Sequence, residues 1–575
     1  MSKALTTFGT IIAAAGLVMT GIGAVALPGL AGAVSVFGVS AGTLTAIGSG
    51  LAAVGSMTAS KPSTTYAGDQ TEWSLDPTSP IPYHIGRTYN AGVVRHVDAY
   101  GSKRAYRSLV MVYSGAGPVQ GTEAWFADDK AVPFAGGAAQ GYYSGWMWLD
   151  AQAGQTPEAR ALTPPVAGFP NWGPAHKLSG YDAALLTLKW DKKGKVFSAG
   201  TPKFGKVGDG VRVYDARQDS TWPGGDGPCR FGDESTYVGG SAARNPWCHA
   251  LTYAMGRFHN GKRVVGVGKP KNGIDIAAFV AAANVADANG WTIGGVTFDD
   301  GEGAKWNNLK LMCQAGGGEP IHVGGKLSCK VSAPRVSVGR IGPDDLAEGR
   351  ISIPAMLSRR SRINGVVPKY RSEGHKWEMI SGSVVRIGAY VAEDRGQRTK
   401  EIEYRLVQCF AGQEAKQAAQ LAAYDVVNAR EFGPIVIPCK PRMWGFKPGD
   451  AVTIDLPAQG LNGQLAVILN RKLNVATGAV ELTLASETTA KHPLALGATT
   501  VAPPTPALSD PEVIDAAAAD DTDTAAIVVL QQGVEGQGAA LQQQAAVIAQ
   551  QAATLAGAES RILELKNRLD AMQAA

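Results

Sequence analysis

An apolar residue recurs at every seventh position near the end of the chain, from Ile527 to Leu569. The position three residues after each of them holds Leu, Gln, Ala or Met, which completes the a/d seam of helices that wind around one another. Glycines at 533, 536 and 538 weaken the first turns, so we expect the helix from about residue 539. The seam residues of this part are Leu541, Gln544, Ile548, Gln551, Leu555, Ile562, Leu565, Leu569 and Met572.

Gln occupies three successive inner positions of this seam, at 537, 544 and 551. These side chains bury less apolar surface than Leu, but they can hydrogen-bond around a closed ring and fix the register and the number of helices. We therefore interpret the segment as a parallel homotrimeric coiled coil. The alternative is one amphipathic helix that packs on its own domain. The strict period and the terminal position favour self-assembly.

The composition favours extended, turn-rich β structure over a compact helical enzyme. The 575 residues, enough for about three to five domains, include 72 Gly and only 18% charged residues. The net charge of +5 is spread along the chain, so no nucleic-acid footprint is indicated. The six cysteines lack CxxC spacing and are typical of reduced, mostly buried thiols in a protein made in a cytoplasm. A disulfide between two of them stays open.

Residues 4–60 contain no charged side chain, and Pro28 with Gly29 divides them into two apolar runs of near membrane-spanning length. A cleaved signal peptide fits poorly because the apolar stretch is too long. A resident helical hairpin in a cell membrane would be only weakly hydrophobic. A segment packed inside an assembly and a segment released into a target membrane both stay open. The residues that would insert are Ile11, Leu17, Val18, Ile22, Phe37, Leu44 and Leu51.

Alternating apolar residues predict strands from residue 81 onward. We expect them at 85–87, 93–97, 108–112, 123–126, 146–149, 184–190 and 211–214, with a Pro- and Gly-rich loop over 151–180. Later strands are expected at 319–322, 326–331, 365–370, 402–407, 435–438, 451–456, 465–470 and 481–485. Helical spacing predicts helices over 246–255, 274–289, 304–315 and 414–430.

Few residues carry a pattern of known chemistry. Asp299, Asp300 and Glu302 are the tightest carboxylate cluster, but they lack the order of calcium ligands, so we interpret them as a solvated loop. Cys248 and His249 with His259 do not complete a tetrahedral metal set. The basic run Arg359, Arg360 and Arg362 is interpreted as a solvated face, with the lining of a DNA passage as the alternative. No hydrolase or protease signature is present, so we expect neither enzymatic activity nor a cofactor.

Several stretches, taken in order, resemble the tip attachment (host-specificity) proteins J of lambda-like long-tailed phages. The likeness covers about residues 81–490. Its motifs are the Tyr106-to-Phe134 segment around the Gly115–Pro118 turn, Val211 to Asp215 followed by Asn245 to Ala250, the helices from Ile274 and from Trp306, the hairpin at 319–331, Gln417 to Leu421, and Phe446 to Ile454. The apolar residues 4–60 and the segment Pro82 to Arg95 are similar to the C-terminal half of tail assembly protein I. The chain therefore resembles a fusion of the two.

The resemblance implies a trimeric hub at the distal end of the tail of a virion, made in the host cytoplasm. It would close the tail tube with two similar β-barrel domains per subunit, and it would contact the distal tail protein, other tail-tip proteins, the tape measure protein and central or side tail fibres. DNA would only pass through it, and a contact with the host envelope membrane stays open. The chain ends in a short coil without large receptor-binding regions, which puts direct receptor recognition in doubt.

The expected fold is multidomain and mainly β with α+β insertions, preceded by an apolar helical segment and followed by the trimeric coil. We divide it into an apolar segment (1–60), a first β hub domain (61–200), an α+β hub domain (201–330), a second β hub domain with a helix (331–440), a small β domain (441–497), an acidic linker (498–524) and the coil (525–575). The competing functions are a membrane-inserting conduit for DNA formed by residues 4–60, a trimeric surface adhesin, and a cell-wall enzyme.

Overall fold

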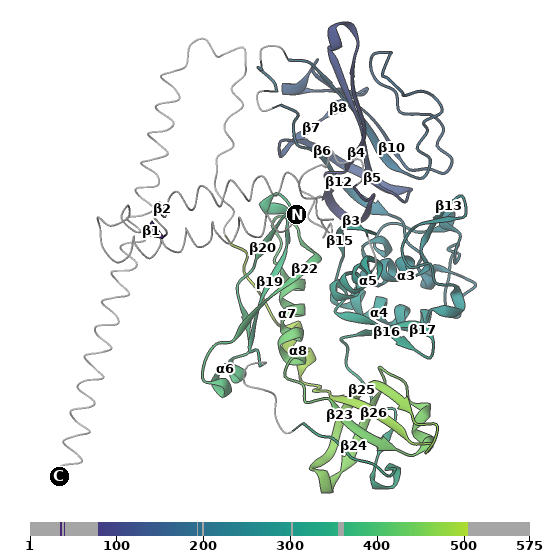
Figure 1. Cartoon of the computed structure of the whole chain (residues 1–575), viewed down its shortest axis with the longest axis vertical. Helices are drawn as coiled ribbons and strands as arrows, with labels where there is room; N and C mark the ends of the chain where they lie inside the picture. Colours follow the sequence, from purple (N-terminus) through teal and green to yellow (C-terminus); the bar gives the residue numbers. More distant parts are fainter. Residues whose placement is uncertain are drawn as a thin grey trace, which may run out of the picture. The chain divides into compact units, whose positions relative to one another are not determined.

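The computed structural model describes residues 79–191, 194–197, 200–300, 303–354 and 362–503, together with two short paired strands, β1 (Ser35–Val36) and β2 (Val39–Ser40). The described part is mainly β, as predicted (Figure 1). The coiled-coil seam and the side chains of the apolar N-terminal segment lie outside the described residues.

The first sheet contains four of the predicted strands. Its order is β4 (Val93–Tyr100), β5 (Tyr106–Ser114), β11 (Asp182–Lys189), β10 (Met147–Ala153), β9 (Ala138–Ala139) and β8 (Phe134–Ala135). The predicted loop over 151–180 follows β10. Leu162 and Phe169 of this loop pack on Val110, Val112 and Leu185 of the sheet. The loop thereby covers the apolar residues on one face of β5 and β11.

The second sheet runs β15 (Gly294–Phe298), β3 (Pro82–Asn90), β12 (Phe204–Val211), β6 (Val119–Ala127) and β7 (Lys130–Val132). The strand predicted at 211–214 is wrong, because the strand ends at Val211 and begins at Phe204. Its three glycines suggest a turn, yet β12 lies between β3 and β6. A Cβ on Gly208 would stand 2.3 Å from the carbonyl oxygen of Gly121. Glycine is therefore required here by close strand packing.

A buried ion pair joins the two sheets. The Lys206 ammonium of β12 lies 2.6 Å from a carboxylate oxygen of Asp182 in β11, and it also faces the rings of Tyr113 and Trp125. Trp125 stacks on Phe204, with ring centroids 5.5 Å apart. A charged pair surrounded by aromatic rings thus holds the sheets together.

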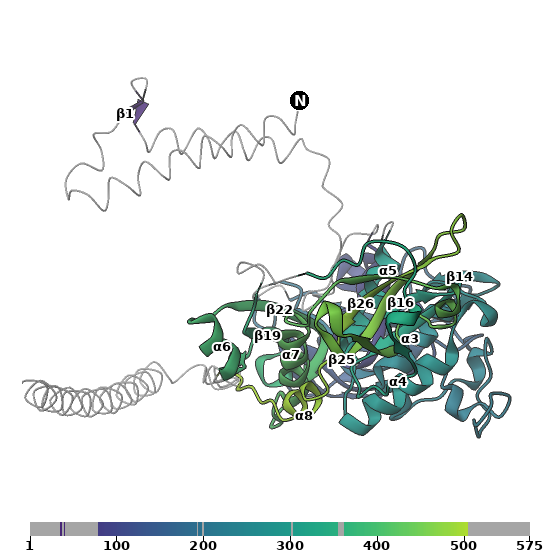
Figure 2. The same ribbon diagram turned by 90° about the horizontal axis from the view of Figure 1, so that it is seen from below.

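Three predicted helices pack together, as Figures 1 and 2 show. These are α3 (Pro246–Met255), α4 (Ile276–Asn289) and α5 (Ala304–Ala315), all close to their expected bounds. Asn245 caps α3 by accepting from the backbone N–H of Trp247 and Cys248. Gly290 ends α4 in the left-handed conformation that glycine adopts easily. Two hairpins lie in the same region: β13 (Arg257–His259) with β14 (Lys262–Val265), and β16 (Gly318–Val323) with β17 (Lys326–Val331).

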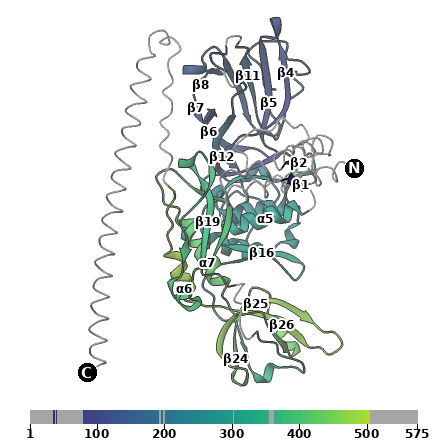
Figure 3. The same ribbon diagram turned by 60° about the vertical axis from the view of Figure 1, so that its left-hand side comes forward.

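A third sheet packs against a long helix (Figure 3). It contains β20 (Glu378–Ser381), β19 (Gly365–Ser372), β21 (Val385–Arg386) and β22 (Thr399–Cys409), and the helix is α7 (Lys416–Asn428). The short helix α6 (Gly388–Asp394) had no sequence signal. Arg87 of β3 connects the second and third sheets, because its guanidinium pairs with Glu373 at 2.8 Å and lies against Trp377 and Phe410.

Four of the five strands of the last sheet are inserted in the chain between α7 and the helix α8 (Lys491–Leu496), whereas the fifth, β18, precedes both helices. Its order is β18 (Arg340–Ile341), β24 (Ala451–Leu456), β25 (Leu461–Leu473), β26 (Val480–Ser486) and β23 (Ile435–Cys439). Ser352 exchanges two backbone hydrogen bonds with Val436, so the segment after β18 returns along the far edge at β23. The segment that follows β18 thus connects the two edge strands, β18 and β23. The sheet encloses its own apolar core.

A second unit includes residues 140–144 and 191–201. In it, the Tyr142 hydroxyl donates to the carbonyl oxygen of Lys195 at 3.1 Å, and Tyr143 stacks on Phe197.

Candidate functional site

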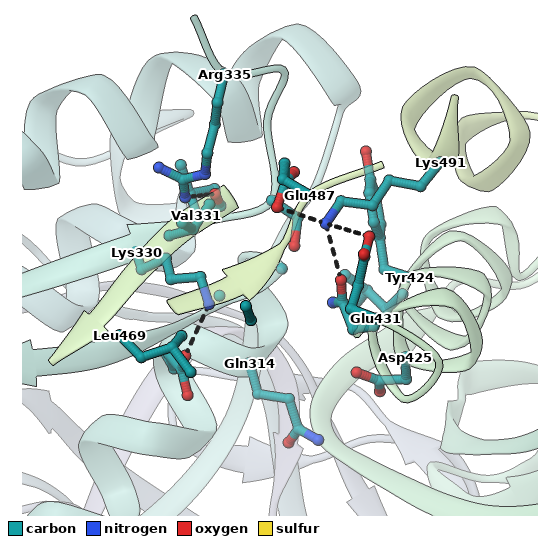
Figure 4. Close-up of a pocket in the computed structure, with 18 of the residues that line it drawn as sticks. Gln314, Lys330, Val331, Arg335, Tyr424, Asp425, Glu431, Leu469, Glu487 and Lys491 are labelled. Carbon is teal, nitrogen blue, oxygen red and sulfur yellow. Dashed lines mark hydrogen bonds and ion pairs between the residues drawn. The ribbon is translucent and has the colours of Figure 1, made fainter. Parts of the chain in front are cut away.

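A cavity of about 420 Å³ lies where the last sheet is inserted between α7 and α8 (Figure 4). Its walls come from β17, from α7 and from β25 and β26, and the chain segments that enter and leave the last sheet pass beside it. Leu421, Val467 and Ala485 form part of its apolar surface. The register of β25 against β26 shifts between Ile468 and Asn470, which leaves Leu469 at the cavity as an exposed side chain.

A buried ionic cluster occupies one side of this cavity. The Lys491 ammonium lies 2.9 Å from Glu487 and 3.6 Å from Glu431, and it donates to the side-chain oxygen of Asn428 at 3.1 Å (Figure 4). The side chains of all three charged residues are nearly fully buried. Such a cluster holds only while each charge keeps its partners, since an unpaired buried charge is costly.

Glu431 and Glu487 connect the outgoing and returning segments of the chain. Glu431 follows α7, and its carboxylate accepts from the backbone N–H of Thr488 at 2.8 Å and from the Ser486 hydroxyl. Glu487 also lies 3.4 Å from His492, whose other ring nitrogen is 3.1 Å from the Tyr424 hydroxyl of α7. The last sheet is therefore fixed at both of its connections to the two helices.

The cavity changes the acidity of three of its groups. Burial acts to raise the pKa of Glu487, but the hydrogen bond with His492 and the nearby Lys491 outweigh it, so this pKa lies below its usual range. Burial lowers the pKa of Arg335, which donates to the carbonyl oxygens of Gly449 and Val331. Burial raises the pKa of Asp425, which accepts from the Tyr404 hydroxyl at 2.6 Å. Each of the three groups thus has a partner within the protein. These interactions join the segments of the chain that surround the cavity.

The predicted solvated loop at Asp299 is wrong. The Asp299 carboxylate accepts from the Tyr253 hydroxyl of α3, from the backbone N–H of Gly266 at 2.7 Å and from the Asn308 amide of α5 at 3.1 Å. Burial and this carboxylate raise the pKa of Tyr253. Asp299 is a structural tie between two helices and a hairpin, whereas Glu302 lies outside the described residues.

The Cys and His residues singled out above do not converge. His249 is fully buried in α3, where a ring nitrogen lies 2.7 Å from the carbonyl oxygen of Ala243. Cys248 lies on the same helix, where its sulfur is 3.7 Å from Arg217, and His259 belongs to β13. Within the described ranges, no group of three His, Cys, Asp or Glu side chains could hold a metal ion. The thiols are free and mostly buried, with Cys329 alone partly exposed.

The basic run is only partly described. Arg362 lies 3.6 Å from Glu393 and 3.7 Å from Asp394, so this residue is part of an ion-pair cluster instead of the predicted solvated face. Arg359 and Arg360 lie outside the described residues, as do the coiled-coil seam and the side chains of the predicted insertion residues. Each helix in the described ranges is too short or too polar to span a bilayer.

Sequence reasoning missed the cluster around the cavity. Glu487 and Lys491 are four residues apart, which is the one signal that could have suggested an ion pair on a helical turn. Glu431 is 56 residues away from Glu487 along the chain, and nothing in the sequence connects the two. Only the insertion of the last sheet between α7 and α8 brings them together.

No protein-family model and no curated protein matches the sequence. Among solved structures, a chain of the virion of a native gene transfer agent particle is similar at 16% identity and a TM-score of 0.48, over 76% of this chain and 91% of that chain. A tail protein from Neisseria meningitidis MC58 is similar at 17% identity and a TM-score of 0.26, over 37% of this chain and 68% of that chain. Both are similarities between chains of very different sequence.

Proposed function

We propose that this protein is a structural component of the tail tip of a long-tailed bacteriophage, where it forms a trimeric hub. The hub closes the tail tube, anchors tip proteins and a fibre, and opens for DNA ejection. The observation that carries the proposal is the order of the motifs along residues 81–490. The helices that begin near Ile274 and Trp306 fall on α4 and α5, and the hairpin at 319–331 falls on β16 and β17.

Three of these motifs illustrate the agreement. The turn at Gly115–Pro118 joins β5 to β6. Asn245 caps α3, at the Asn-Pro-Trp stretch. The turn at 447–450 leads into β24, and the Asp450 carboxylate accepts from the Lys447 backbone N–H at 2.8 Å. The order of the sequence motifs supports the proposal more strongly than any motif alone.

The heptad seam supports the trimer. Three chains joined along residues 539–575 would set their β domains around one axis, and a closed ring must match the symmetry of the tube that it caps. We propose the distal tail protein, other tail-tip proteins, the tape measure protein and tail fibres as partners, and the distal end of the virion tail as the location. DNA passes through the hub without being read. The proposed role contains no catalytic step.

Sedimentation of the purified full chain tests the trimer. Leu555→Asp with Ile562→Asp places charges on the seam, so we expect it to dissociate the trimer. Ser560→Asp adds a charge at a position away from the seam and is the matched control. A full chain that sediments as a single subunit, or a seam variant that stays trimeric, would contradict the assembly. Electron microscopy of the particle with this chain located in it tests the position.

Residues 4–60 favour a second candidate, in which they enter the host envelope and form a conduit for DNA. The observation behind it is the complete lack of charge over this stretch. Asp substitutions at Val18, Phe37 and Leu51 would then abolish infectivity and leakage of liposomes. Infectivity that survives all three substitutions would eliminate this candidate and leave the hub proposal intact.

A further inference from the structure

Two turns meet at one end of the last sheet. One is the 474–479 turn between β25 and β26, and the other is Pro441–Gly445, which follows β23. Leu473 pairs with Val480, and Val480 pairs with Cys439, so the three strands end side by side. A Cβ on Gly478 would lie 3.6 Å from the Pro441 ring. The two turns therefore form one continuous surface.

Large apolar side chains on this surface are left in solvent. Val475 is 86% exposed, Trp444 is 42% exposed and Leu473 is 40% exposed. Isolated exposed apolar residues are common, but three side by side, on two adjoining turns and the strand end next to them, are a feature of interaction sites. With the cations Lys440, Arg471 and Lys472 they make up what we call the hairpin-tip patch.

The cations of the patch lack acidic partners. The Arg471 guanidinium lies 4.1 Å from the centroid of the Trp444 ring and donates to the carbonyl oxygens of Trp444 and Phe446. Lys440 and Lys472 are exposed. None of the three forms an ion pair with a described residue. Glu481 lies opposite Lys472 in the register without forming such a pair, so the patch keeps an excess of positive charge.

We propose that the hairpin-tip patch docks on the surface of an anionic lipid bilayer. Trp side chains favour the headgroup level of a membrane, Lys and Arg favour anionic headgroups, and exposed aliphatic side chains can enter the boundary with the acyl chains. The patch combines all three, with its most exposed apolar residue, Val475, at the turn itself.

Two other occupants fit the patch less well. A nucleic acid would use the cations and the Trp444 ring but would leave Leu473 and Val475 in water. A second copy of the patch, related by a two-fold axis, would bring unpaired cations of the same sign together. The membrane contact goes beyond the proposed hub function and does not depend on the trimer or on residues 4–60.

Flotation of the full chain with vesicles of equal parts phosphatidylglycerol and phosphatidylcholine tests the contact. We expect Lys440→Gln and Lys472→Gln each to weaken binding by about fivefold. We expect Leu473→Ser with Val475→Ser to reduce it further. Lys326→Gln and Lys416→Gln remove exposed cations elsewhere, and Val501→Ser removes a 74% exposed aliphatic residue, so these controls should bind like the parent.

A local probe separates the patch from residues 4–60, which could bind vesicles on their own. The variant Val475→Cys, labelled with an environment-sensitive fluorophore, should shift its emission to the blue with the anionic vesicles and not with phosphatidylcholine alone. The same label on Leu494→Cys should not respond. An unresponsive Val475 label, patch variants that float like the controls, or patch variants that lose only oligonucleotide binding or self-association would overturn the proposal.

Discussion

The Lys206 ammonium lies 2.6 Å from a carboxylate oxygen of Asp182, and each side chain is only 2% exposed. The two residues come from different sheets, so their contact is one of the ties between β12 and β11. Burial raises the pKa of Asp182, and the charge of Lys206 opposes that rise. An uncharged substitution at either residue therefore leaves the other charged side chain buried without its partner.

Lys206→Met should destabilise the protein by about 3–5 kcal/mol, because it leaves the Asp182 carboxylate buried and unpaired. Urea unfolding followed by tryptophan fluorescence measures the effect, since Trp125 lies beside the ammonium. Lys376→Met is the matched control. Lys376 pairs with Asp129 at 3.3 Å on the surface, where the pair should contribute less than about 1 kcal/mol.

The double variant Lys206→Met with Asp182→Leu tests the reason for that loss. Because it removes both charges, it should recover most of the stability. A double variant as unstable as Lys206→Met would show that the loss comes from packing and not from the unpaired carboxylate.

Gly208→Ala should destabilise β12 by about 1–3 kcal/mol, because the new methyl group would meet the Gly121 carbonyl oxygen and the strands would have to separate. Gly121→Ala in the adjoining strand is the control, since its Cβ would meet nothing within 4 Å. Thermal unfolding of both variants makes the comparison. Equal melting temperatures would show that the sheet adjusts to a methyl group at 208.

The sequence predicted those elements whose own residues carry the pattern. The helix at 304–315 matches α5, and the strand at 451–456 matches β24. Asn245 and Gly290 marked helix ends correctly because capping is a local interaction. For such elements, the spacing of the apolar residues and the capping residues are enough to predict the type of element and its bounds.

Elements and contacts that depend on residues distant in the chain could not be predicted. The glycines of β12 suggest a turn, and only the neighbouring strands explain them. The Asp299 carboxylate was interpreted as solvated because its partners, Tyr253 and Asn308, belong to two different helices. The cluster of Glu431 and Lys491 depends in the same way on where the last sheet is inserted.

Stability should fall as the pH is lowered below about 6.5, because two histidines are buried in their neutral form. Burial and the nearby Lys206 lower the pKa of His84 to about 3, and burial lowers the pKa of His249 to about 4. Between pH 6.5 and these values the unfolded chain binds protons that the folded chain does not. Each histidine then costs about 1.4 kcal/mol of stability per pH unit.

His84→Gln should reduce this slope by one proton, whatever it does to stability at neutral pH. Chemical unfolding at a series of pH values between 7 and 4 measures the slope. The exposed His176 provides the control variant His176→Gln, which should keep the parent slope. A His84→Gln variant with the parent slope would mean that the His84 ring takes up its proton over the same pH range in the folded protein as in the unfolded chain.

Glu487→Gln should loosen the connection between α7, α8 and the last sheet while leaving that sheet folded. The amide loses the negative charge that pairs with Lys491, a loss of about 2 kcal/mol for a charged hydrogen bond. Hydrogen exchange should therefore become faster in α8 and in residues 429–434, but not in β24, whose core is separate. The parent should show the same loosening in acid, because a carboxyl group with a lowered pKa stabilises the fold above about pH 4.5 and stops doing so as it becomes protonated.

Glu401→Gln, which breaks an exposed pair with Lys369, is the control and should exchange like the parent. Unchanged exchange in α8 of the Glu487 variant would show that the apolar contacts between α7 and α8 hold this connection without the ionic cluster.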